Sequence, residues 1–432
     1  MSLDSGREVL DRLLERGFTA AEVYVKRGRS RRFEIDGEAE ATLSADEAGW
    51  SVRAARGAAS FFFAAAGSPL PLDHWPEAFD GEPLALPEGL PIADWSEPPA
   101  VTDPLLAEDE GRRVLRGVAE DLARRLPGAT LAAVLEDGSS EVRILNHHGL
   151  DAGYRGRFAA LRLEARAPLD AGAAVATLAL AERSARRFRI AAMADRLVDV
   201  LAVRARGSLG APEGADVVLT PEVAARLLAP VAAAFVGRTR DQVADLLDAR
   251  DGRVGAADVS LIDDGRHRGG PLSAPIDGEG VPTGTRVLVD SGRLESTILP
   301  WERSSMPIGC RVRPGWRDLP RVGTTQVYVA PRADTTPASL VEDLADGYYL
   351  LDAGDGGRYD LAAGRFSLPV WGFRIAGGRP LHPTGEARLV GDPRRLLHAV
   401  CGVARDLRFV PLGALVGAPT VRMRGLTLHS HG

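Results

Sequence analysis

This 432-residue sequence contains very few lysines and cysteines, and neither positive nor negative residues strongly outnumber the other. Lysine occurs once, at Lys26, so arginine supplies almost all of the positive charge. The net charge of −6 does not favour nucleic-acid or anionic-membrane partners, which attract basic proteins. The two cysteines, Cys310 and Cys401, form no C-x-x-C pair and make no disulfide framework. We therefore expect reduced thiols and a cytoplasmic protein.

Long hydrophobic runs are also missing. No apolar stretch approaches the roughly 20 residues that span a bilayer. The opening segment, residues 1–17, is a charged amphipathic helix without the apolar core of a signal peptide. We therefore expect no membrane partner.

Several catalytic motifs do not occur in the sequence. None of the eight histidines has another four or five positions away, so neither H-E-x-x-H nor H-E-x-x-x-H exists. There is no phosphate-binding P-loop and no G-x-S-x-G nucleophile elbow. The sequence thus contains no recognisable zinc-peptidase, nucleotide-binding or serine-hydrolase site.

The hydrophobic periodicity predicts an α+β fold. Helix-on-antiparallel-sheet regions come first, and a mixed, mainly antiparallel β-rich C-terminal domain follows. Two glycine positions within alternating segments, Gly28 and Asp137-Gly138, predict hairpin turns. We expect an N-terminal α/β region at 1–66, a proline-rich strap at 67–103, a central α/β region at 104–206, a linker at 207–215 and the β-rich domain at 216–432.

A nearly featureless helix is predicted directly after the linker. Thr220 can cap its start, Pro221 suits its first turn, and Gly237 can end it. Between these ends the side chains are almost all apolar, with Val223, Leu227 and Val231 on one face. By composition alone this is an ordinary buried helix.

Acidic residues gather in the glycine-rich segment 261–294. Asp263 and Asp264 end a predicted strand, and Asp277 and Glu279 lie in the loop that follows. Paired carboxylates can perform acid–base chemistry or hold a cation. They can equally accept hydrogen bonds from backbone N–H groups in tight turns, and the residue pattern favours that role.

The stretches "SLIDDG", "PIDGEGVPT" and "VLVDSGRL", together with "GWSVRAARGAASFF" and "AAGRFSLPVWGFRIAGGRPLHP", resemble the TldD/TldE (PmbA) family of two-subunit metallopeptidases. The resemblance runs in order along nearly the whole chain. In the family's TldD-like subunit, an H-E-x-x-x-H helix after the linker and a cysteine near the C-terminus bind zinc; the TldE-like subunit has no metal site. Here the helix in that slot is apolar, and Cys401 lies too early to match.

The resemblance therefore implies a non-catalytic, TldE-like subunit. It would hold no cofactor of its own and would pair with a TldD-like subunit that carries zinc. The family acts on small unstructured peptides, including ribosomally made precursors. The family's second loop aspartate is Gly278 here, and segment 300–320 departs from the usual sequence. Candidates for the peptide channel or partner interface are Asp263, Asp264, Arg268, Asp277, Glu279, Gly280, Phe366 and Ser367.

Two other functions remain open from the sequence. One is a metal-independent enzyme that uses Asp263, Asp264, Asp277 and Glu279. The other is a carrier that binds peptides and delivers them to an unrelated enzyme.

Overall fold

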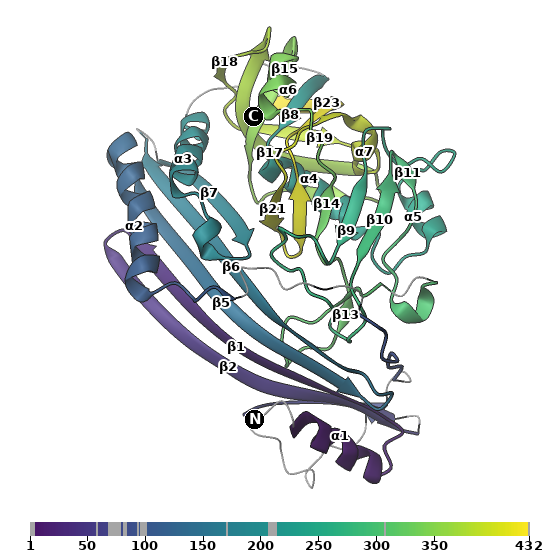
Figure 1. Cartoon of the computed structure of the whole chain (residues 1–432). Coiled ribbons are helices and arrows are strands. Elements are labelled where there is room, and N and C mark those ends of the chain that lie inside the picture. Colours follow the sequence, from purple (N-terminus) through teal and green to yellow (C-terminus); the bar gives the residue numbers. More distant parts are fainter. Residues whose placement is uncertain are drawn as a thin grey trace.

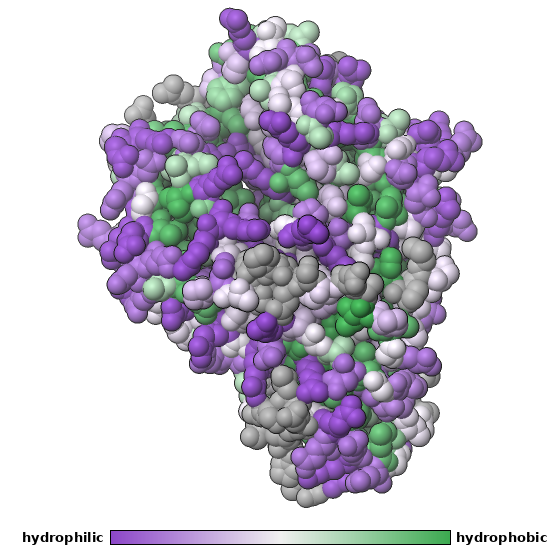
Figure 2. All heavy atoms as spheres, viewed as in Figure 1, coloured by the Kyte–Doolittle hydropathy of each residue, from purple (hydrophilic) through white to green (hydrophobic). Residues whose placement is uncertain are grey.

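The computed structural model describes residues 5–57, 59–67, 79–80, 84–92, 95, 102–169, 172–205, 214–305 and 308–430. Most of the predicted strap at 67–103 and of the predicted linker at 207–215 falls outside these ranges, and the domain boundaries stay predictions. No helix among the described residues is long and apolar enough to cross a membrane. Hydrophilic side chains predominate on the face shown in Figure 2, where hydrophobic ones gather only in small groups.

A single seven-stranded antiparallel sheet forms the N-terminal half, in the order β4-β3-β2-β1-β5-β6-β7. Strands from the predicted regions 1–66 and 104–206 are joined in it, because β1 pairs with β5 along 15 residue pairs. The sheet is long and curved, with α1 at one end and α2 and α3 near the other (Figure 1). Its elements are α1 Ser5–Glu15, β1 Ala20–Asp36, β2 Ala39–Arg56, β3 Ala59–Ala66, β4 Phe79–Asp80, α2 Glu108–Arg125, β5 Thr130–Asn146, β6 Asp151–Pro168, β7 Ala173–Glu182, η3 Ala185–Arg187 and α3 Ile190–Arg204.

The two predicted hairpin turns are wrong. Gly28 lies inside the continuous strand β1, and Asp137-Gly138 lies inside β5. The glycine at 138 is explained by packing, because a Cβ atom there would come within 2.3 Å of the Phe158 ring on β6. Apolar side chains alternate along both strands and bury one face against α1 or α2.

The C-terminal half contains two larger sheets with α4 packed between them. The six-stranded sheet has the order β11-β10-β9-β14-β22-β21. In the eight-stranded sheet β17 pairs with both β19 and β15, so the path β15-β8-β23-β19-β17 closes on itself. Among the described residues, two pairings in these sheets are parallel, β14 with β22 and β15 with β8, and the others are antiparallel. The prediction of an α+β fold with a mixed, mainly antiparallel C-terminal domain is confirmed.

The elements of this half are β8 Ala215–Leu219, α4 Pro221–Ala233, α5 Arg240–Leu246, β9 Leu261–Asp264, β10 Thr285–Asp290, β11 Arg293–Leu294, η4 Trp301–Arg303, β12 Arg311–Val312, β13 Arg321–Val322, β14 Val327–Val329, α6 Pro337–Glu342, β15 Asp346–Ala353, β16 Arg358–Asp360, β17 Arg365–Ala376, β18 Arg379–Pro383, β19 Ala387–Gly391, η5 Pro393–Arg395, α7 Leu396–Ala399, β20 Val400–Val403, β21 Arg408–Pro411, β22 Leu415–Ala418 and β23 Val421–Ser430.

Candidate functional site

The helix α4 lies in the main C-terminal core. Val223 and Leu227 are 0% exposed and Val231 is 2% exposed, and all three pack in one hydrophobic cluster with strands of both sheets. The Thr220 hydroxyl does not cap the helix as predicted, because it donates to the Leu351 carbonyl at 2.9 Å. Aliphatic side chains have no lone pairs for a metal ion, so α4 does not fit a zinc site.

The same conclusion holds more widely in the described part of the chain. No group of three or more His, Cys, Asp and Glu side chains there is arranged to hold a metal ion. Glu222, the one acidic residue of α4, contacts Arg196 and Arg408. Burial raises the pKa of Glu222, but these two arginines outweigh burial and hold it below its usual value. This carboxylate is therefore a charged partner of arginines.

Asp263 and Asp264 end β9 and serve different neighbours. One oxygen of Asp263, Oδ1, accepts from the backbone N–H groups of Thr325 and Gln326 at 2.8 and 3.0 Å. Oδ1 of Asp264 accepts from the Arg266 N–H at 2.9 Å. Burial raises the pKa of Asp263, and the bonds from Thr325 and Gln326 oppose that rise. Both side chains stabilise the turns beside the strand.

Asp277 connects two loops through four backbone N–H groups. Oδ1 accepts from Glu279 and Val281 at 2.9 and 3.0 Å, and Oδ2 accepts from Cys310 and Arg311 at 2.9 Å each. Burial raises the pKa of Asp277 to about 7, while the N–H donors act in the opposite direction. With every lone-pair direction of the carboxylate occupied, the primary role of Asp277 is to shape these loops.

Glu279 belongs to a charged cluster that joins the two halves of the molecule. Its Oε1 accepts from Arg53 Nη1 on β2 at 2.7 Å, and Arg53 Nε donates to Glu22 on β1 at 2.9 Å. Arg313, from the C-terminal half, donates to the same Glu22 carboxylate at 2.9 Å and stacks 4.0 Å from the centre of the Tyr24 ring. Arg311 lies 3.1 Å from the other Glu279 oxygen. We call Glu22, Arg53, Glu279, Arg311 and Arg313 the interdomain ion cluster.

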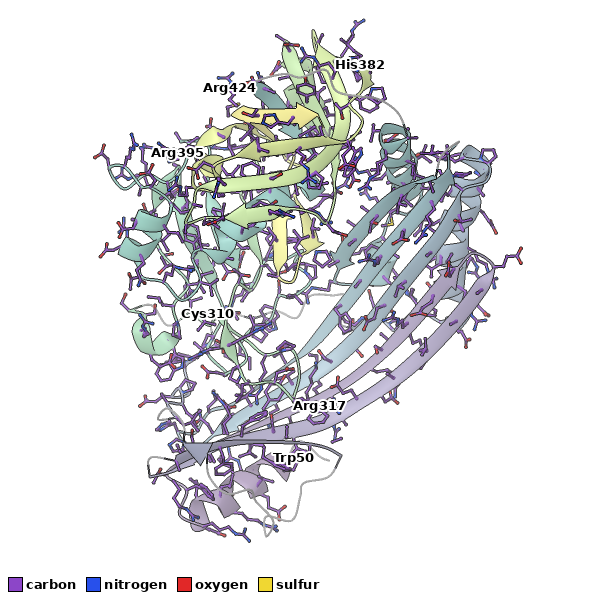
Figure 3. The ribbon with its side chains drawn as sticks, turned by 180° about the vertical axis from the view of Figure 1, so that it is seen from behind. Trp50, Cys310, Arg317, His382, Arg395 and Arg424 are labelled. Carbon is purple, nitrogen blue, oxygen red and sulfur yellow. The ribbon has the colours of Figure 1, made fainter. Side chains whose placement is uncertain are left out.

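A cavity of about 580 Å³ lies beside this cluster, between the long sheet and the C-terminal loops. Strands β1, β2, β5 and β6 line one side; residues of the loops at 271–278 and 311–314, with Thr324 and Thr325, line the other. Asp277 borders it, and so do Lys26 and Arg183. In Figure 3, Cys310 and Arg317 mark the loops that lie between the C-terminal sheets and the long strands. Of the predicted acidic residues, Asp277 is the one that lines this interdomain cavity.

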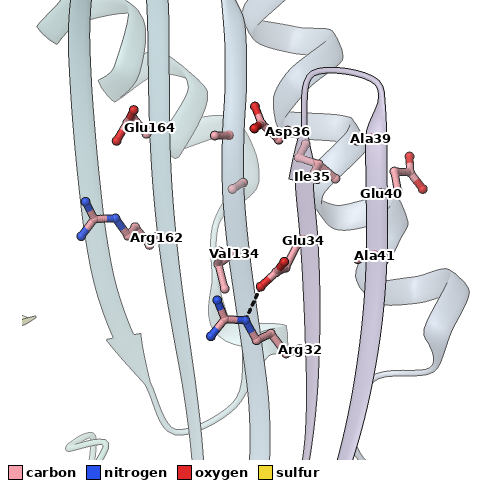
Figure 4. Close-up of a pocket in the computed structure, with 12 residues that line it drawn as sticks. Arg32, Glu34, Ile35, Asp36, Ala39, Glu40, Ala41, Val134, Arg162 and Glu164 are labelled. Atoms are coloured by element: carbon pink, nitrogen blue, oxygen red, sulfur yellow. Dashed lines mark hydrogen bonds and ion pairs between the residues drawn. The ribbon is translucent and has the colours of Figure 1, made fainter.

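A second hollow, of about 380 Å³, lies at the other end of the sheet (Figure 4). Charged side chains on neighbouring strands line it, and Arg32 pairs there with Glu34. None of the predicted site residues lines this hollow. Its charges face solvent, so we assign it no chemistry.

Residues 212–430, slightly more than half of the chain, match the family model described as the PmbA/TldA metallopeptidase C-terminal domain. The chain belongs to this PmbA/TldD metallopeptidase family. A curated relative, the "Metalloprotease TldD homolog" of Buchnera aphidicola, is 22% identical over 187 residues, which cover 39% of this chain and 38% of that protein. The matched stretch thus spans well under half of the curated relative.

Solved structures show the same fold over almost the entire length. TldE from Thermococcus kodakarensis superposes with a TM-score of 0.83 at 16% identity, covering 98% of this chain and 100% of TldE. A Thermotoga maritima structure gives 0.81 at 16% identity, covering 99% of this chain and all of its own, and a Bacteroides thetaiotaomicron structure gives 0.77 at 15%, covering 99% and 98%. The PmbA/TldD fold therefore extends through the N-terminal sheet.

In this PmbA/TldD chain, the other candidate residues for the peptide channel or partner interface lie in different places and do not line the interdomain cavity. Gly280 has φ +87°, and a Cβ atom there would come within 2.4 Å of Leu150 on the N-terminal side, so glycine permits the close approach. Arg268 is exposed on the loop after β9. Phe366 is buried on β17 and stacks on Tyr359, while Ser367 points to the other face of the strand, within 3.4 Å of Arg388. Neither Phe366 nor Ser367 lines the interdomain cavity.

Sequence reasoning missed the N-terminal side of the cavity. Ser139, Ser140, Arg157 and Arg183 line it, and none was a candidate. A usable signal was present, because the small polar run at 137–140 interrupts an otherwise alternating apolar strand. That run was interpreted as a turn.

Proposed function

We propose that this chain is the non-catalytic, TldE-like subunit of a two-subunit TldD/TldE-type metallopeptidase. The observation that carries the proposal is α4. It follows the first C-terminal strand, in the slot where the resemblance puts the metal-binding helix, and buries Val223, Leu227 and Val231 in the core. A zinc peptidase needs histidine ligands and a glutamate at such a helix.

In this proposal a TldD-like partner holds the zinc ion and the general-base glutamate. The present chain completes the complex and helps to hold a small unstructured peptide, such as a ribosomally made precursor. Its sheets support such a role, because extended peptides are commonly held by main-chain pairing to the edge of a sheet. We place the complex in the cytoplasm, and the free thiols of Cys310 and Cys401 are compatible with that compartment.

The hydrogen bonding of the acidic residues weighs against a metal-independent enzyme. Asp263 and Asp277 accept hydrogen bonds from backbone N–H groups. Glu279 forms ion pairs with Arg53 and Arg311. A general acid or base needs a free lone pair or proton directed at a substrate. These carboxylates are better explained as supports for the loops.

The proposal is tested by expressing the chain alone and together with the TldD-like subunit of its host. We expect the isolated chain to contain no stoichiometric zinc and to leave an unfolded test peptide intact. The co-expressed pair should elute as one complex that contains zinc and cleaves the peptide.

A partner variant without the glutamate of H-E-x-x-x-H serves as the control, and it should assemble without cleaving. One tightly bound zinc per isolated chain would contradict the assignment. Elution of the two proteins only as separate monomers would contradict it as well.

A further inference from the structure

The floor of the interdomain cavity is hollowed by a row of small residues. Gly28 on β1, Ser140 on β5 and Gly156 on β6 lie directly opposite one another in the sheet register. The adjacent rows carry larger groups, including Tyr154 on one side and Phe158 on the other. The small row leaves space on the sheet that the C-terminal loops cover without filling.

One buried cation borders this space without an anionic partner. Arg183, directly after β7, is 1% exposed, and its Nη2 donates to the carbonyls of Gly270 and Ser273 at 2.6 and 3.2 Å. Its Nε has no acceptor. Within the described part of the chain, no carboxylate lies within ion-pair distance of it.

Among the described residues, three of the four other buried arginines are paired with carboxylates. The fourth, Arg286, donates to the Ile308 carbonyl and does not line the cavity. Arg53 and Arg313 contact Glu22, and Arg157, which lines the same cavity, contacts Asp137 at 3.0 Å. Burial lowers the pKa of Arg183 to about 10, so its guanidinium stays charged at neutral pH. An unpaired buried charge is unfavourable, and an anion that enters the cavity relieves this cost.

We propose that the interdomain cavity binds the C-terminal carboxylate of an unfolded peptide, with Arg183 as its cationic partner. The choice of a peptide rests on the proposed function; the choice of a carboxylate rests on Arg183. Guanidinium and carboxylate groups match in charge and geometry. The cavity volume of about 580 Å³ suits the last few residues of a chain.

The other residues that line the cavity fit a peptide whose last side chains are uncharged. Lys26 and Arg29 add positive charge to the lining, and Ser30, Ser139 and Ser140 supply hydroxyl groups for main-chain contacts. Glu47 and Glu136 also line the cavity. Both carboxylates are more exposed than Arg183. They disfavour acidic side chains just before the terminus.

The test is calorimetric titration of the full isolated chain with an N-acetylated hexapeptide that has no charged side chain, once with a free C-terminal carboxylate and once as the C-terminal amide. We expect the acid to bind about tenfold or more tightly than the amide, as for a charge-assisted contact. Arg183→Gln should remove this difference, and Arg183→Lys should retain part of it. Arg187→Gln makes the same charge change at an exposed neighbour and should leave the difference intact.

Several results of these titrations would overturn the proposal. They are equal affinity for acid and amide, no binding of either peptide, and a persistent acid preference in a folded Arg183→Gln variant. Displacement of the acid by equimolar inorganic phosphate would also overturn it, because the cavity would then be a general oxyanion site. No partner or zinc is present in the titration, so its failure leaves the subunit assignment standing, and loss of that assignment leaves the titration interpretable.

Discussion

Glu22 is a buried carboxylate that links the two halves of the molecule. Its side chain is 0% exposed and accepts hydrogen bonds from Arg53 of the N-terminal sheet and from Arg313 of the C-terminal half. Burial raises the pKa of Glu22, but the charges and hydrogen bonds of the two arginines outweigh burial and hold it below the usual value. The ionised form is therefore the one that the folded protein stabilises.

Glu22→Gln should lower the free energy of unfolding at pH 7 by about 3–5 kcal/mol, because it leaves buried arginines without their anion. The pH dependence has a defined sign. Since the pKa is lower in the folded state, the stabilisation by Glu22 is complete above its unfolded pKa of about 4.3 and is lost as pH falls through the folded value. Urea titrations from pH 7 to pH 3 should show a steeper acid loss for the wild type than for the variant.

Glu40→Gln provides a matched control, because Glu40 pairs with Arg116 at the exposed edge of the sheet. We expect a much smaller change in stability for this variant. If the free energy of unfolding falls equally with pH in the wild type and in Glu22→Gln, Glu22 is not the group whose protonation weakens the folded state.

The sequence could flag Asp263, Asp277 and Glu279, because acidic residues in glycine-rich turns stand out locally. It also favoured their role in satisfying backbone donors, which is how the structure uses Asp263 and Asp277. It could not show that Glu279 contacts Arg53, since 226 positions separate them. Such pairs depend on the packing of whole elements, which no local pattern encodes.

At the scale of elements, the long strands of the N-terminal sheet show how tertiary packing overrides a local turn signal. The Asp-Gly pair at 137–138 favours a hairpin in isolation. In the protein, β5 continues through it, paired with β1 and β6 on its two sides, and Phe158 covers the glycine. Strands elsewhere, such as β8 and β14, were predictable because they are short, largely apolar and bounded by turn residues.

Gly138→Ala should destabilise the sheet by about 1–3 kcal/mol, because the added Cβ atom would lie 2.3 Å from the Phe158 ring. Gly28→Ala is the matched change on the neighbouring strand. There the nearest atom would be 3.4 Å away, so we expect little loss or a slight gain in stability. Thermal unfolding of both variants measures the difference, and equal effects would show that Phe158 does not enforce glycine at 138.

At the scale of the whole molecule, an aromatic contact accompanies the interdomain ion cluster. Trp316 is buried against β2, where a Cβ atom on Gly49 would come within 2.1 Å of the indole. It belongs to a hydrophobic cluster with Ile276 and with Tyr24, Val142, Ile144 and Leu150 of the N-terminal half. Polar and apolar contacts together thus join the two halves where the C-terminal loops meet the long sheet.

Trp316→Ala should cost about 3–5 kcal/mol and uncouple the two halves, because it empties the centre of this cluster. Urea unfolding followed by far-UV circular dichroism and by tryptophan fluorescence should then give transitions that no longer coincide. Trp301→Ala, in the half-buried turn η4, removes an indole outside this cluster and should keep a single transition. Coincident transitions for Trp316→Ala would show that the ion cluster alone couples the halves.

Lys26 is the one side chain of the protein that carries a primary amine. Lys26 Nζ donates to the Pro314 carbonyl at 2.7 Å, so the one ε-amine of the chain spans the contact between the halves and borders the cavity. Every other strongly basic side chain is an arginine, which amine-directed acylating reagents leave intact at neutral pH. A fluorophore delivered by lysine chemistry would therefore have one side-chain amine to attach to, at the border of the cavity, besides the α-amine of the N-terminus.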